Sequence, residues 1–349
     1  MKVLILAGGF GTRLYPLTWA RPKSIVPLAN TPFLERMLTW LRRHGLMDVI
    51  LAVNHLPEMI RDCFGDGSSF GVNLEFLLED IPLGSGGAIR NAQHLLGEET
   101  FLVLNGDILT DLNLEKMIQF HRTRKAQMTI SLARVEDPSG YGVVDMEADG
   151  RLRRFVEKPA PEEAPSNYIN AGAWLFEPET LDKMPVKGTP FSVEREFWPK
   201  CLEEGMPMFG YPEDCYWMDI GTVNRYLEAH RDLLAGRIQV SIKEPEISPR
   251  IWQGKGAQVH PGATLIAPVI IGAGATVGPD AEISDTVIGP GSIIEAGAVV
   301  CKSVLWEKVQ VGQGARITNS VIGARQKIDP KRILDDTAVE ELGARSPEE

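Results

Sequence analysis

The sequence predicts an α/β domain built on a mostly parallel sheet, followed by a parallel β-helix. In the first part of the chain, short apolar runs alternate with helical stripes, a pattern typical of a parallel sheet that helices cover on both faces. In the last third, aliphatic residues recur every six residues, with Gly, Ala and Ser between them. A length of 349 residues also exceeds the usual size of one hydrophobic core. We therefore expect two domains of different architecture.

The first domain is expected over residues 1–236. Its early strands fall on apolar runs at residues 2–6, 49–53, 73–78 and 101–104. The carboxyl ends of parallel strands share one edge of a sheet, where ligands of such folds bind. Residues that follow these runs are therefore the first candidates for a functional site.

Helical stripes lie between these strands. One helix is expected from Pro32 to a cap at Gly45, and a second over residues 84–96, opened by a flexible, glycine-rich turn. Beyond Met128 the pattern changes to strands, with a hairpin at Asp149-Gly150 that could build a second wall of the cleft. A helix over residues 223–234 closes the domain, with Gly236 as its stop.

The repeat in the last third predicts stacked coils. The spacing is six residues from Val259 to Ile283, with slips to five at Ile288 and Leu305. Six residues for each inward aliphatic side chain make one side of a triangular coil, which buries its interior by stacking on the next coil. We expect a β-helix over residues 258–323, resembling the hexapeptide repeats of left-handed β-helices. A linker at 237–257 precedes it, and the charged tail at 324–349 is expected to be frayed or a short helix.

A glycine-rich turn follows the first strand directly. Gly8 to Leu14 contains three glycines, a threonine and Arg13, and Lys23 follows nearby. Glycines let backbone N–H groups approach an anion, and the two cations supply compensating charge, so the turn suits a polyphosphate. It matches neither a Walker A loop nor a dinucleotide-binding fingerprint. Judged alone, the segment could also be a structural turn with surface cations.

Composition excludes several functions. A net charge of -11 and a pI near 5.2 argue against a nucleic-acid-binding surface. Four cysteines without C-x-x-C spacing indicate reduced thiols rather than disulfides or a zinc site. We expect a cytoplasmic protein with no signal peptide and no membrane-spanning segment.

Two acidic residues could hold a metal ion. Asp107 ends the fourth strand in Asn105-Gly106-Asp107, and Asp219 precedes the closing helix in Trp217-Met218-Asp219. Mg²⁺ takes one or two protein carboxylates and leaves positions for phosphate oxygens. Each aspartate could instead be an N-cap or a turn residue.

Glu157-Lys158-Pro159 follows another apolar run. The lysine is placed to contact an anionic second substrate and the glutamate to accept from hydroxyls. A solvated pair at a strand end is the alternative.

Together these residues resemble a known family, the sugar-1-phosphate nucleotidylyltransferases. The resemblance is greatest to the mannose-1-phosphate guanylyltransferase branch. It rests on the appended hexapeptide repeats and on the sequence segments around Tyr141, Phe155 and Ile169. Six motifs appear in the family's order: Gly8 to Leu14 with Pro22-Lys23, Asn105-Gly-Asp107, Tyr141-Gly-Val-Val, Phe155-Val-Glu-Lys-Pro159, Asn170-Ala-Gly172 and Trp217-Met-Asp-Ile-Gly221. The resemblance implies a Rossmann-like, mixed sheet followed by a left-handed β-helix, which could pair subunits into a homo-oligomer.

The resemblance also implies a reaction. A sugar 1-phosphate attacks the α-phosphorus of a nucleoside triphosphate in line, and pyrophosphate leaves. Asp107 and Asp219 would hold Mg²⁺, Arg13 and Lys23 would stabilise the pyrophosphate, and Lys158 would hold the sugar phosphate. The implied nucleotide-binding residues are Leu6, Ala7, Gly8, Gly9, Gly11, Thr12, Glu79, Pro82, Gly84 and Asn105. The implied sugar-phosphate-binding residues are Tyr141, Gly142, Glu157, Lys158, Asn170 and Trp217.

The nucleotide and the sugar stay open. Glu79 stands where pyrimidine-using relatives often have Gln, and a carboxylate that only accepts hydrogen bonds favours GTP. Leu6-Ala7 before the glycines is equally typical of thymidylyl- and uridylyltransferases. Mannose 1-phosphate is favoured, with glucose and heptose 1-phosphates as alternatives. Two other functions are alternatives. One is a regulatory homologue that senses a sugar nucleotide, and the other is an acyltransferase that uses His260.

Overall fold

The computed structural model describes residues 1–340, and the chain divides into two compact units. The first, which we call the sheet unit, consists of Met1–Gly9 and Met37–Trp217. The second, the coil unit, consists of Phe10–Arg36 and the chain from Met218 onward. The division differs from the expected boundary after residue 236, because the glycine turn's second half and the closing helix group with the β-helix.

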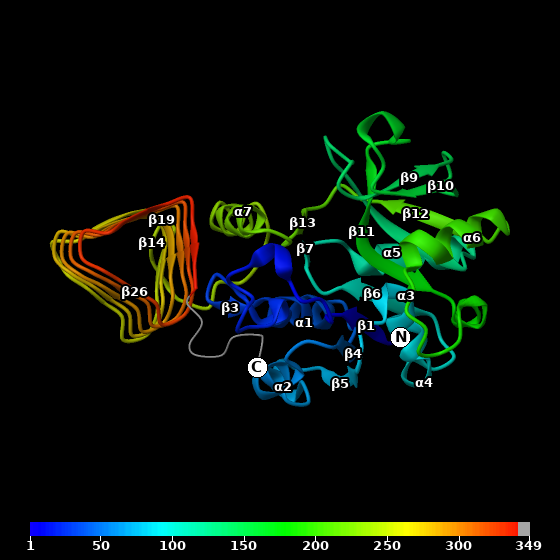
Figure 1. Ribbon diagram of the computed structural model, residues 1–349, viewed down its shortest axis with the longest axis horizontal. Helices are drawn as coiled ribbons and strands as arrows, with labels where there is room; N and C mark the ends of the chain where they lie inside the picture. Colours follow the sequence, from blue (N-terminus) through cyan, green and yellow to red (C-terminus); the bar gives the residue numbers. More distant parts are fainter. Residues whose placement is uncertain (341–349) are drawn as a thin grey trace. The chain divides into compact units, whose positions relative to one another are not determined.

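The sheet unit is built on one mixed sheet, with the order β10-β9-β11-β6-β1-β4-β5 and with β8 joining β11 to β12 (Figure 1). β1 runs parallel to β4 and β6, and its last residue, Leu6, pairs with Ala52 and Asn105. The strands are β1 (Val3–Leu6), β4 (Asp48–Val53), β5 (Asn73–Leu78), β6 (Phe101–Asn105), β8 (Met128–Arg134), β9 (Gly142–Met146), β10 (Leu152–Glu157), β11 (Tyr168–Phe176) and β12 (Met208–Pro212). The expected early strands and the β9–β10 hairpin are confirmed.

Helices pack on this sheet. α3 (Gly84–Asn91) contacts β1, α5 (Leu114–Arg124) contacts β8 and β12, and α6 (Trp198–Glu203) contacts β10. The remaining α-helices within residues 1–340 are α1 (Phe33–Arg43), α2 (Pro57–Phe64), α4 (Gln93–Leu96) and α7 (Val223–Leu234). The sequence predicted one helix over 84–96, which is wrong in detail. The N–H of Ala92 is shared between the carbonyls of Ala88 and Ile89, and this tighter turn separates α3 from α4.

The interior of the sheet unit is aromatic. Phe101 and Phe176 stack with ring centroids 5.5 Å apart, and Trp174 meets Trp198 edge to face at 5.0 Å. All four side chains are buried. Such pairs stabilise a core beyond the area that they bury.

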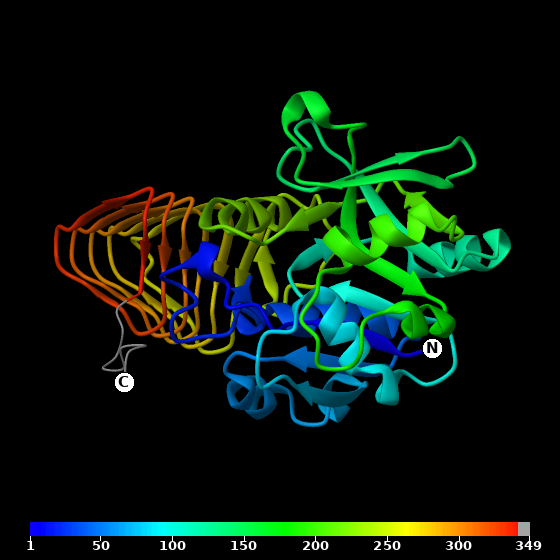
Figure 2. The same ribbon diagram turned by 45° about the vertical axis from the view of Figure 1, so that its right-hand side comes forward.

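The coil unit contains the β-helix, whose coils have a triangular outline in Figure 1 and stack as successive layers in Figure 2. Its strands pair in parallel from coil to coil, except for the antiparallel pair of β14 with β15. They are β14 (Glu246–Ser248), β15 (Ile251–Gln253), β16 (Gln258–Val259), β17 (Thr264–Ile271), β18 (Thr276–Val277), β19 (Glu282–Ile288), β20 (Ile293–Ile294), β21 (Val299–Cys301), β22 (Val304–Leu305), β23 (Gln310–Val311), β24 (Arg316–Thr318), β25 (Val321–Ile322), β26 (Lys327–Ile328), β27 (Ile333–Asp335) and β28 (Ala338–Val339).

The aliphatic repeat forms three ladders inside the coils. Side chains at corresponding positions of successive coils lie in register, so each coil covers the apolar interior of its neighbour. The ladders are Val259, Val277, Ile294, Val311 and Ile328; Leu265, Ile283, Val300, Ile317 and Leu334; and Ile271, Ile288, Leu305, Ile322 and Val339.

The slip from six residues to five has a structural cause. β17 carries an irregularity between Ile266 and Val269 where it pairs with β19, so the first coil holds one residue more than the next. Later coils lack this bulge and turn the same corner with five residues. The period therefore changes while the ladders stay in register.

Two expectations for the ends of the β-helix are wrong. β15 lies within the predicted linker at 237–257 but pairs with β17 in the stack. The tail from residue 324 was expected to be frayed or helical, yet β26, β27 and β28 continue the three ladders. Charged residues between the aliphatics masked the pattern. The end of the predicted tail, residues 341–349, lies outside the described residues.

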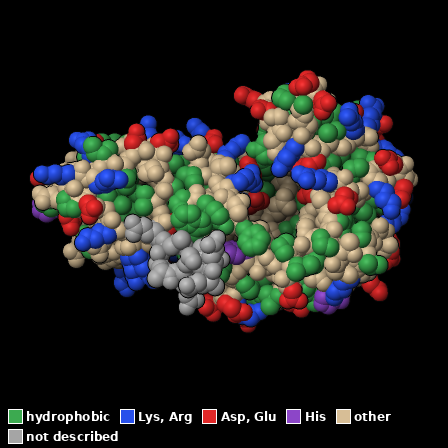
Figure 3. Space-filling model, in the orientation of Figure 1, with side chains coloured by type: hydrophobic (Ala, Val, Ile, Leu, Met, Phe, Trp, Pro, Cys, Tyr) green, Lys and Arg blue, Asp and Glu red, His purple; other side chains and the backbone are tan. Residues whose placement is uncertain are grey.

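The surface of the β-helix mixes charges. On the face that Figure 3 shows, Lys and Arg side chains and Asp and Glu side chains are intermixed over the coils. None of the helices between residues 1 and 340 combines the length and the hydrophobicity of a membrane-spanning segment.

Candidate active site

The turn that contains Asp107 packs against the end of β1 in the sheet unit. The backbone N–H of Gly106 donates to the carbonyl of Leu6 at 3.0 Å. A Cβ atom at Gly106 would lie 2.8 Å from that same oxygen, so only glycine allows this approach. The turn after β6 is therefore fixed against the end of β1: Gly106 lies against Leu6 and Ala7, and Asp107 is the next residue of this turn.

Glu79 lies next to Gly8. Its backbone N–H donates to Val53 at 3.0 Å, and the side chain of Asn54 donates to its carbonyl at 2.7 Å. A Cβ atom at Gly8 would be 3.5 Å from Asn54 and 3.7 Å from Oε2 of Glu79. Asn54 could not be predicted from the sequence, because an asparagine after a strand carries no distinctive pattern.

The carboxyl group of Glu79 is only partly satisfied. Within residues 1–340, its Oε1 atom is buried and has no hydrogen-bond partner. Burial raises the pKa of Glu79 above its ordinary value, although a hydrogen bond from the backbone of Leu83 opposes the shift. A buried acceptor without a donor is costly, and an N–H donor placed against this oxygen would remove that cost.

The second half of the glycine turn belongs to the coil unit. Gly11 has φ of 66°, and its carbonyl accepts from the hydroxyl of Thr18 at 2.9 Å. A Cβ atom at Gly11 would lie 3.3 Å from Cβ of Lys23, so the turn and Lys23 are packed together. Short 3₁₀ turns follow at Thr12–Leu14 and Lys23–Ile25.

Arg13 and Asp219 meet at Gly221 in the same unit. A Cβ atom at Gly221 would lie 2.8 Å from Oδ2 of Asp219 and 3.1 Å from Nη1 of Arg13. Asp219 ends β13 (Trp217–Asp219), and Gly221 precedes Thr222, whose side chain caps α7 by accepting from the N–H of Arg225. The start of α7 thus places an acid beside a cation of the glycine turn.

The candidate sugar-side residues gather in the sheet unit. The rings of Tyr141 and Trp217 meet edge to face with centroids 5.5 Å apart. Gly142 pairs with Glu157 across the β9–β10 hairpin, and a Cβ atom at Gly142 would lie 2.7 Å from Oε2 of Glu157. The N–H of Lys158 donates to the carbonyl of Tyr141 at 2.9 Å, with Lys158 in the left-handed region at φ of 50°.

Asn170 has a structural role in the same region. Its Oδ1 atom accepts from the N–H of Gly172 at 3.0 Å and from the indole of Trp174 at 2.7 Å. The indole of Trp217 donates to the carbonyl of Ala171 at 2.8 Å. With both lone pairs of Oδ1 used, Asn170 can offer a ligand only its amide nitrogen.

Glu157 faces another acid that the sequence analysis missed. Burial and the charge of Glu194 raise the pKa of Glu157, while Lys158 and Arg195 oppose the shift. Glu194 accepts from the hydroxyls of Ser85 and Ser192. Glu194 lies in a segment without any sequence motif, so its position beside Glu157 could not be predicted.

The second glycine-rich turn is explained by packing. The sequence of Gly84 to Gly87 predicted a flexible, donor-rich turn. However, the N–H groups of Gly86 and Gly87 both donate to the carbonyl of Phe191. Cβ atoms would lie 2.6 Å from that carbonyl at Gly84 and 2.1 Å from the ring at Gly86. The glycines therefore admit the Phe191 segment, and the interpretation as a flexible turn is corrected. A ligand role for Gly84 and for the exposed Pro82 stays a prediction.

No protein-only metal centre is present in the described part of the chain. Within residues 1–340, no three His, Cys, Asp or Glu side chains are grouped to hold a metal ion. A metal held by two carboxylates would need oxygens from a substrate to complete its shell.

Comparisons with known proteins identify this fold as that of a nucleotidyltransferase. Residues 2–236 match the family model described as nucleotidyl transferase, and residues 251–344 match the GMPPB C-terminal domain. The chain belongs to the nucleotidyl transferase family and is a sugar-phosphate nucleotidyltransferase.

Relatives differ in the substrates their names state. A mannose-1-phosphate guanylyltransferase of Mycobacterium tuberculosis is 37% identical, covering 86% of this chain and 83% of the relative. A UTP–glucose-1-phosphate uridylyltransferase of Synechocystis is 36% identical, covering 94% and 89%. The crystal structure of HddC from Yersinia pseudotuberculosis complexed with GMP-PN is 30% identical with a TM-score of 0.57, covering 66% of this chain and 99% of that one.

Proposed function

We propose that the protein is a mannose-1-phosphate guanylyltransferase, which forms GDP-mannose and pyrophosphate from GTP and mannose 1-phosphate. The observation that carries the choice of GTP is the buried Oε1 atom of Glu79, which lacks a donor among the described residues and lies in the carboxyl group beside Gly8. The names of the Mycobacterium relative and of the GMP-PN complex support the same choice.

The chemistry of the bases explains why Glu79 selects guanine. Guanine presents two adjacent N–H donors on its pairing edge, whereas uracil and thymine present one donor between two carbonyl acceptors. An ionised carboxylate only accepts hydrogen bonds, so it can pair with both guanine donors and would repel a pyrimidine carbonyl. Binding two donors would also satisfy the buried oxygen.

The proposed reaction is one displacement at phosphorus. An oxygen of the sugar 1-phosphate forms a bond to the α-phosphorus of GTP, and the bond from that phosphorus to the β-phosphate oxygen breaks. The attacking phosphate is already ionised, so no general base is required. Arg13 and Lys23 stabilise the charge on the departing pyrophosphate, and Lys158 holds the sugar phosphate.

Asp107 and Asp219 are the residues that would hold Mg²⁺. Asp219 lies next to Arg13 of the glycine turn, and Asp107 directly follows Gly106, whose backbone N–H donates to the carbonyl of Leu6 at the end of β1. Carboxylate oxygens are the ligands Mg²⁺ prefers, and two of them leave positions for phosphate oxygens, so the residues fit the ion. When bound, the ion would neutralise phosphate charge and orient the two phosphate groups.

Sugar selection is assigned to the region around Glu157. Glu157 can accept from sugar hydroxyls, Asn170 can donate its amide N–H, and the rings of Tyr141 and Trp217 offer an apolar surface beside them. Burial raises the pKa of Glu157, so a hydrogen bond from a sugar hydroxyl would stabilise its half-buried carboxylate.

A second candidate is a glucose-1-phosphate uridylyl- or thymidylyltransferase. The observation that favours it is the Synechocystis relative, whose name states UTP and glucose 1-phosphate. The Leu6-Ala7 pair before the glycines is common to that class as well.

A substrate matrix tests the proposal. GTP, dTTP, UTP, CTP and ATP are each combined with mannose, glucose and heptose 1-phosphates in the presence of Mg²⁺, and pyrophosphate release is measured. We expect the highest kcat/KM for GTP with mannose 1-phosphate. Turnover with UTP or dTTP and glucose 1-phosphate, without turnover of GTP, would contradict the proposal and favour the second candidate function.

A further inference from the structure

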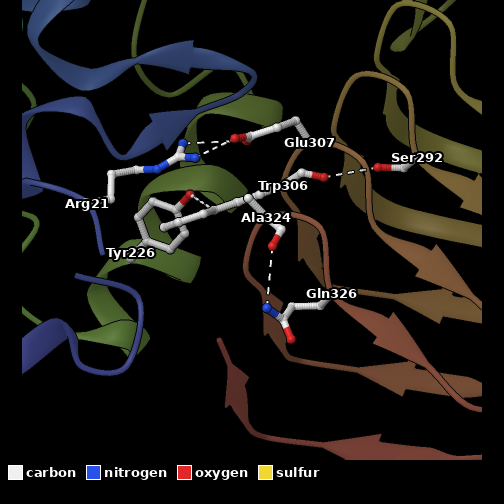
Figure 4. A network of polar contacts seen from close by, with 7 residues as sticks. All are labelled: Arg21, Tyr226, Ser292, Trp306, Glu307, Ala324 and Gln326. Carbon is white, nitrogen blue, oxygen red and sulfur yellow. Dashed lines mark hydrogen bonds and ion pairs between the residues drawn. The ribbon is translucent and has the colours of Figure 1, made fainter. Parts of the chain in front are cut away.

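Arg21 contacts the β-helix within the coil unit. Its guanidinium donates to both carboxylate oxygens of Glu307, and its Cζ atom lies 4.8 Å from the ring centroid of Trp306 (Figure 4). The side chains of Arg21 and Glu307 are 19% and 31% exposed. A two-pronged, half-buried pair stacked on an indole is held much more firmly than an ordinary surface ion pair.

Trp306 extends this contact to α7. Its indole N–H donates to the hydroxyl of Tyr226 at 2.9 Å, and that hydroxyl donates to the carbonyl of Pro27. Trp306 follows the interior residue Leu305, so it points out of the coil, yet it is only 1% exposed. Trp306 therefore links the coil, through Tyr226, to the chain around Pro27, which follows the glycine turn.

Two further residues of the same segment, Ala29 and Asn30, are fixed by hydrogen bonds. The N–H of Ala29 donates to Nε2 of His230 at 3.0 Å, while Nδ1 of that ring donates to the carbonyl of Tyr226 at 2.9 Å. Asn30 donates its amide to Glu244 at 2.9 Å and to the carbonyl of Ile288 at 3.1 Å. The chain from Arg21 to Asn30 is thus tied to α7 and to two coils of the β-helix.

Lys23 lies two residues beyond Arg21, and only Pro22 separates them. The ring of Pro22 fixes φ, here at -58°, so few backbone torsions lie between Arg21 and Lys23. Cβ of Lys23 in turn packs against Gly11. Movement of Arg21 must therefore displace Lys23 and the second half of the glycine turn.

We propose that Arg21 is a positioning residue, and that Trp306 and Glu307 of the β-helix hold Lys23 in its working place through it. The β-helix is then a part of the catalytic apparatus. The consequence for catalysis rests on the proposed function, which gives Lys23 its role at the pyrophosphate. The consequence for local order does not.

A double-mutant cycle on the full chain tests the catalytic part. We expect Arg21→Ala and Glu307→Ala each to lower kcat/KM for the triphosphate about tenfold, with the KM for sugar 1-phosphate unchanged. The double variant should lose no more than either single variant, because both remove one contact. Arg21→Lys should recover only part of the activity, since an ammonium cannot make the two-pronged pair. A double variant whose loss is the product of the single losses would overturn the proposal.

Hydrogen exchange tests the same inference without any substrate. Glu307→Gln should speed amide exchange in residues 11–26, whereas Glu282→Gln, the same change at an exposed carboxylate on β19, should leave it unchanged. Faster exchange in Glu307→Gln supports the positioning role even if no triphosphate and sugar-phosphate pair reacts, in which case the proposed function alone fails. Unchanged exchange in Glu307→Gln, with intact thermal stability, overturns the inference.

Discussion

The carboxylate of Asp219 and the guanidinium of Arg13 both lie against Gly221, at 2.8 and 3.1 Å from the position of its absent Cβ. Gly221 therefore leaves the space that both side chains occupy. Asp219 is the acid proposed to hold Mg²⁺, and Arg13 is the cation proposed to stabilise pyrophosphate. Even a methyl group there would push both side chains away.

Gly221→Ala is accordingly expected to impair catalysis without unfolding the chain. The added methyl displaces Arg13 and Asp219, so kcat should fall roughly 10- to 100-fold. Steady-state kinetics with circular dichroism checks both points. Gly140→Ala is the matched control, because nothing lies within 4 Å of its Cβ position. Full activity in Gly221→Ala would contradict the assigned roles.

Replacing one of the two carboxylates proposed to hold Mg²⁺ should raise the Mg²⁺ concentration that activity requires. In Asp107→Asn and in Asp219→Asn, an amide oxygen replaces an ionised ligand, and half-maximal activity should need at least about tenfold more Mg²⁺. Titration of pyrophosphate release with MgCl₂ measures this. Asp111→Asn serves as the control, since Asp111 accepts from the N–H of Tyr216 in a turn. Unchanged Mg²⁺ curves in both variants would remove the metal assignment.

Glu79→Gln should alter the choice of base. The amide offers a donor where guanine also offers donors, so kcat/KM for GTP should fall roughly 10- to 100-fold, about 1.5–3 kcal/mol. Activity with UTP should fall less or rise. Because burial raises the pKa of Glu79, wild-type preference for GTP should weaken as pH falls and the carboxyl group is protonated, while Glu79→Gln should show no such trend. Equal losses for GTP and UTP would argue against base recognition by Glu79.

Gly86→Ala tests the packing role of the second glycine turn. The new Cβ would lie 2.1 Å from the ring of Phe191, so stability should drop by about 1–3 kcal/mol. Chemical denaturation measures the drop. Combining Gly86→Ala with Phe191→Ala should cost less than the two changes separately, because the smaller side chain makes room. Unchanged stability together with weakened nucleotide binding would restore the interpretation as a ligand-binding turn.

Glu340 should make stability depend on pH. Burial, followed by the opposing charge of Arg21 and the like charge of Glu307, leaves the pKa of Glu340 raised to about 7. The folded chain then keeps a proton that the unfolded chain loses near pH 4.5, so the contribution of Glu340 to stability declines as pH rises from about 4.5 to 7. Glu340→Gln should therefore gain Tm relative to wild type between pH 5 and pH 8. A constant difference in Tm across that range would contradict the raised pKa.

Sequence periodicity predicted most of the architecture, because it reports burial directly. The ladder residues from Val259 to Ile317 were readable, and Ile328, Leu334 and Val339 continue the same spacing. They were missed because charged residues fill the positions between them. A repeat is better judged by its inward positions than by the character of the residues between them.

The contacts between side chains were harder to predict from the sequence than the architecture. Arg21 and Glu307 are 286 residues apart, and neither shows its partner in a local pattern. Phe191 likewise explains Gly84 to Gly87 only once the fold brings the two segments together. Local motifs therefore indicated which residue types form the site, whereas the long-range contacts that hold them required the structure.

The proposed transfer of a guanylyl group to mannose 1-phosphate can be measured against its alternatives in one reaction. The most direct measurement is an internal competition, with equal concentrations of GTP, UTP and dTTP, one pool of mannose 1-phosphate, and Mg²⁺, followed by separation of the sugar nucleotides. Product ratios then equal the ratios of kcat/KM. The account predicts that GDP-mannose predominates by at least about tenfold. Predominance of a UDP- or dTDP-sugar would contradict it.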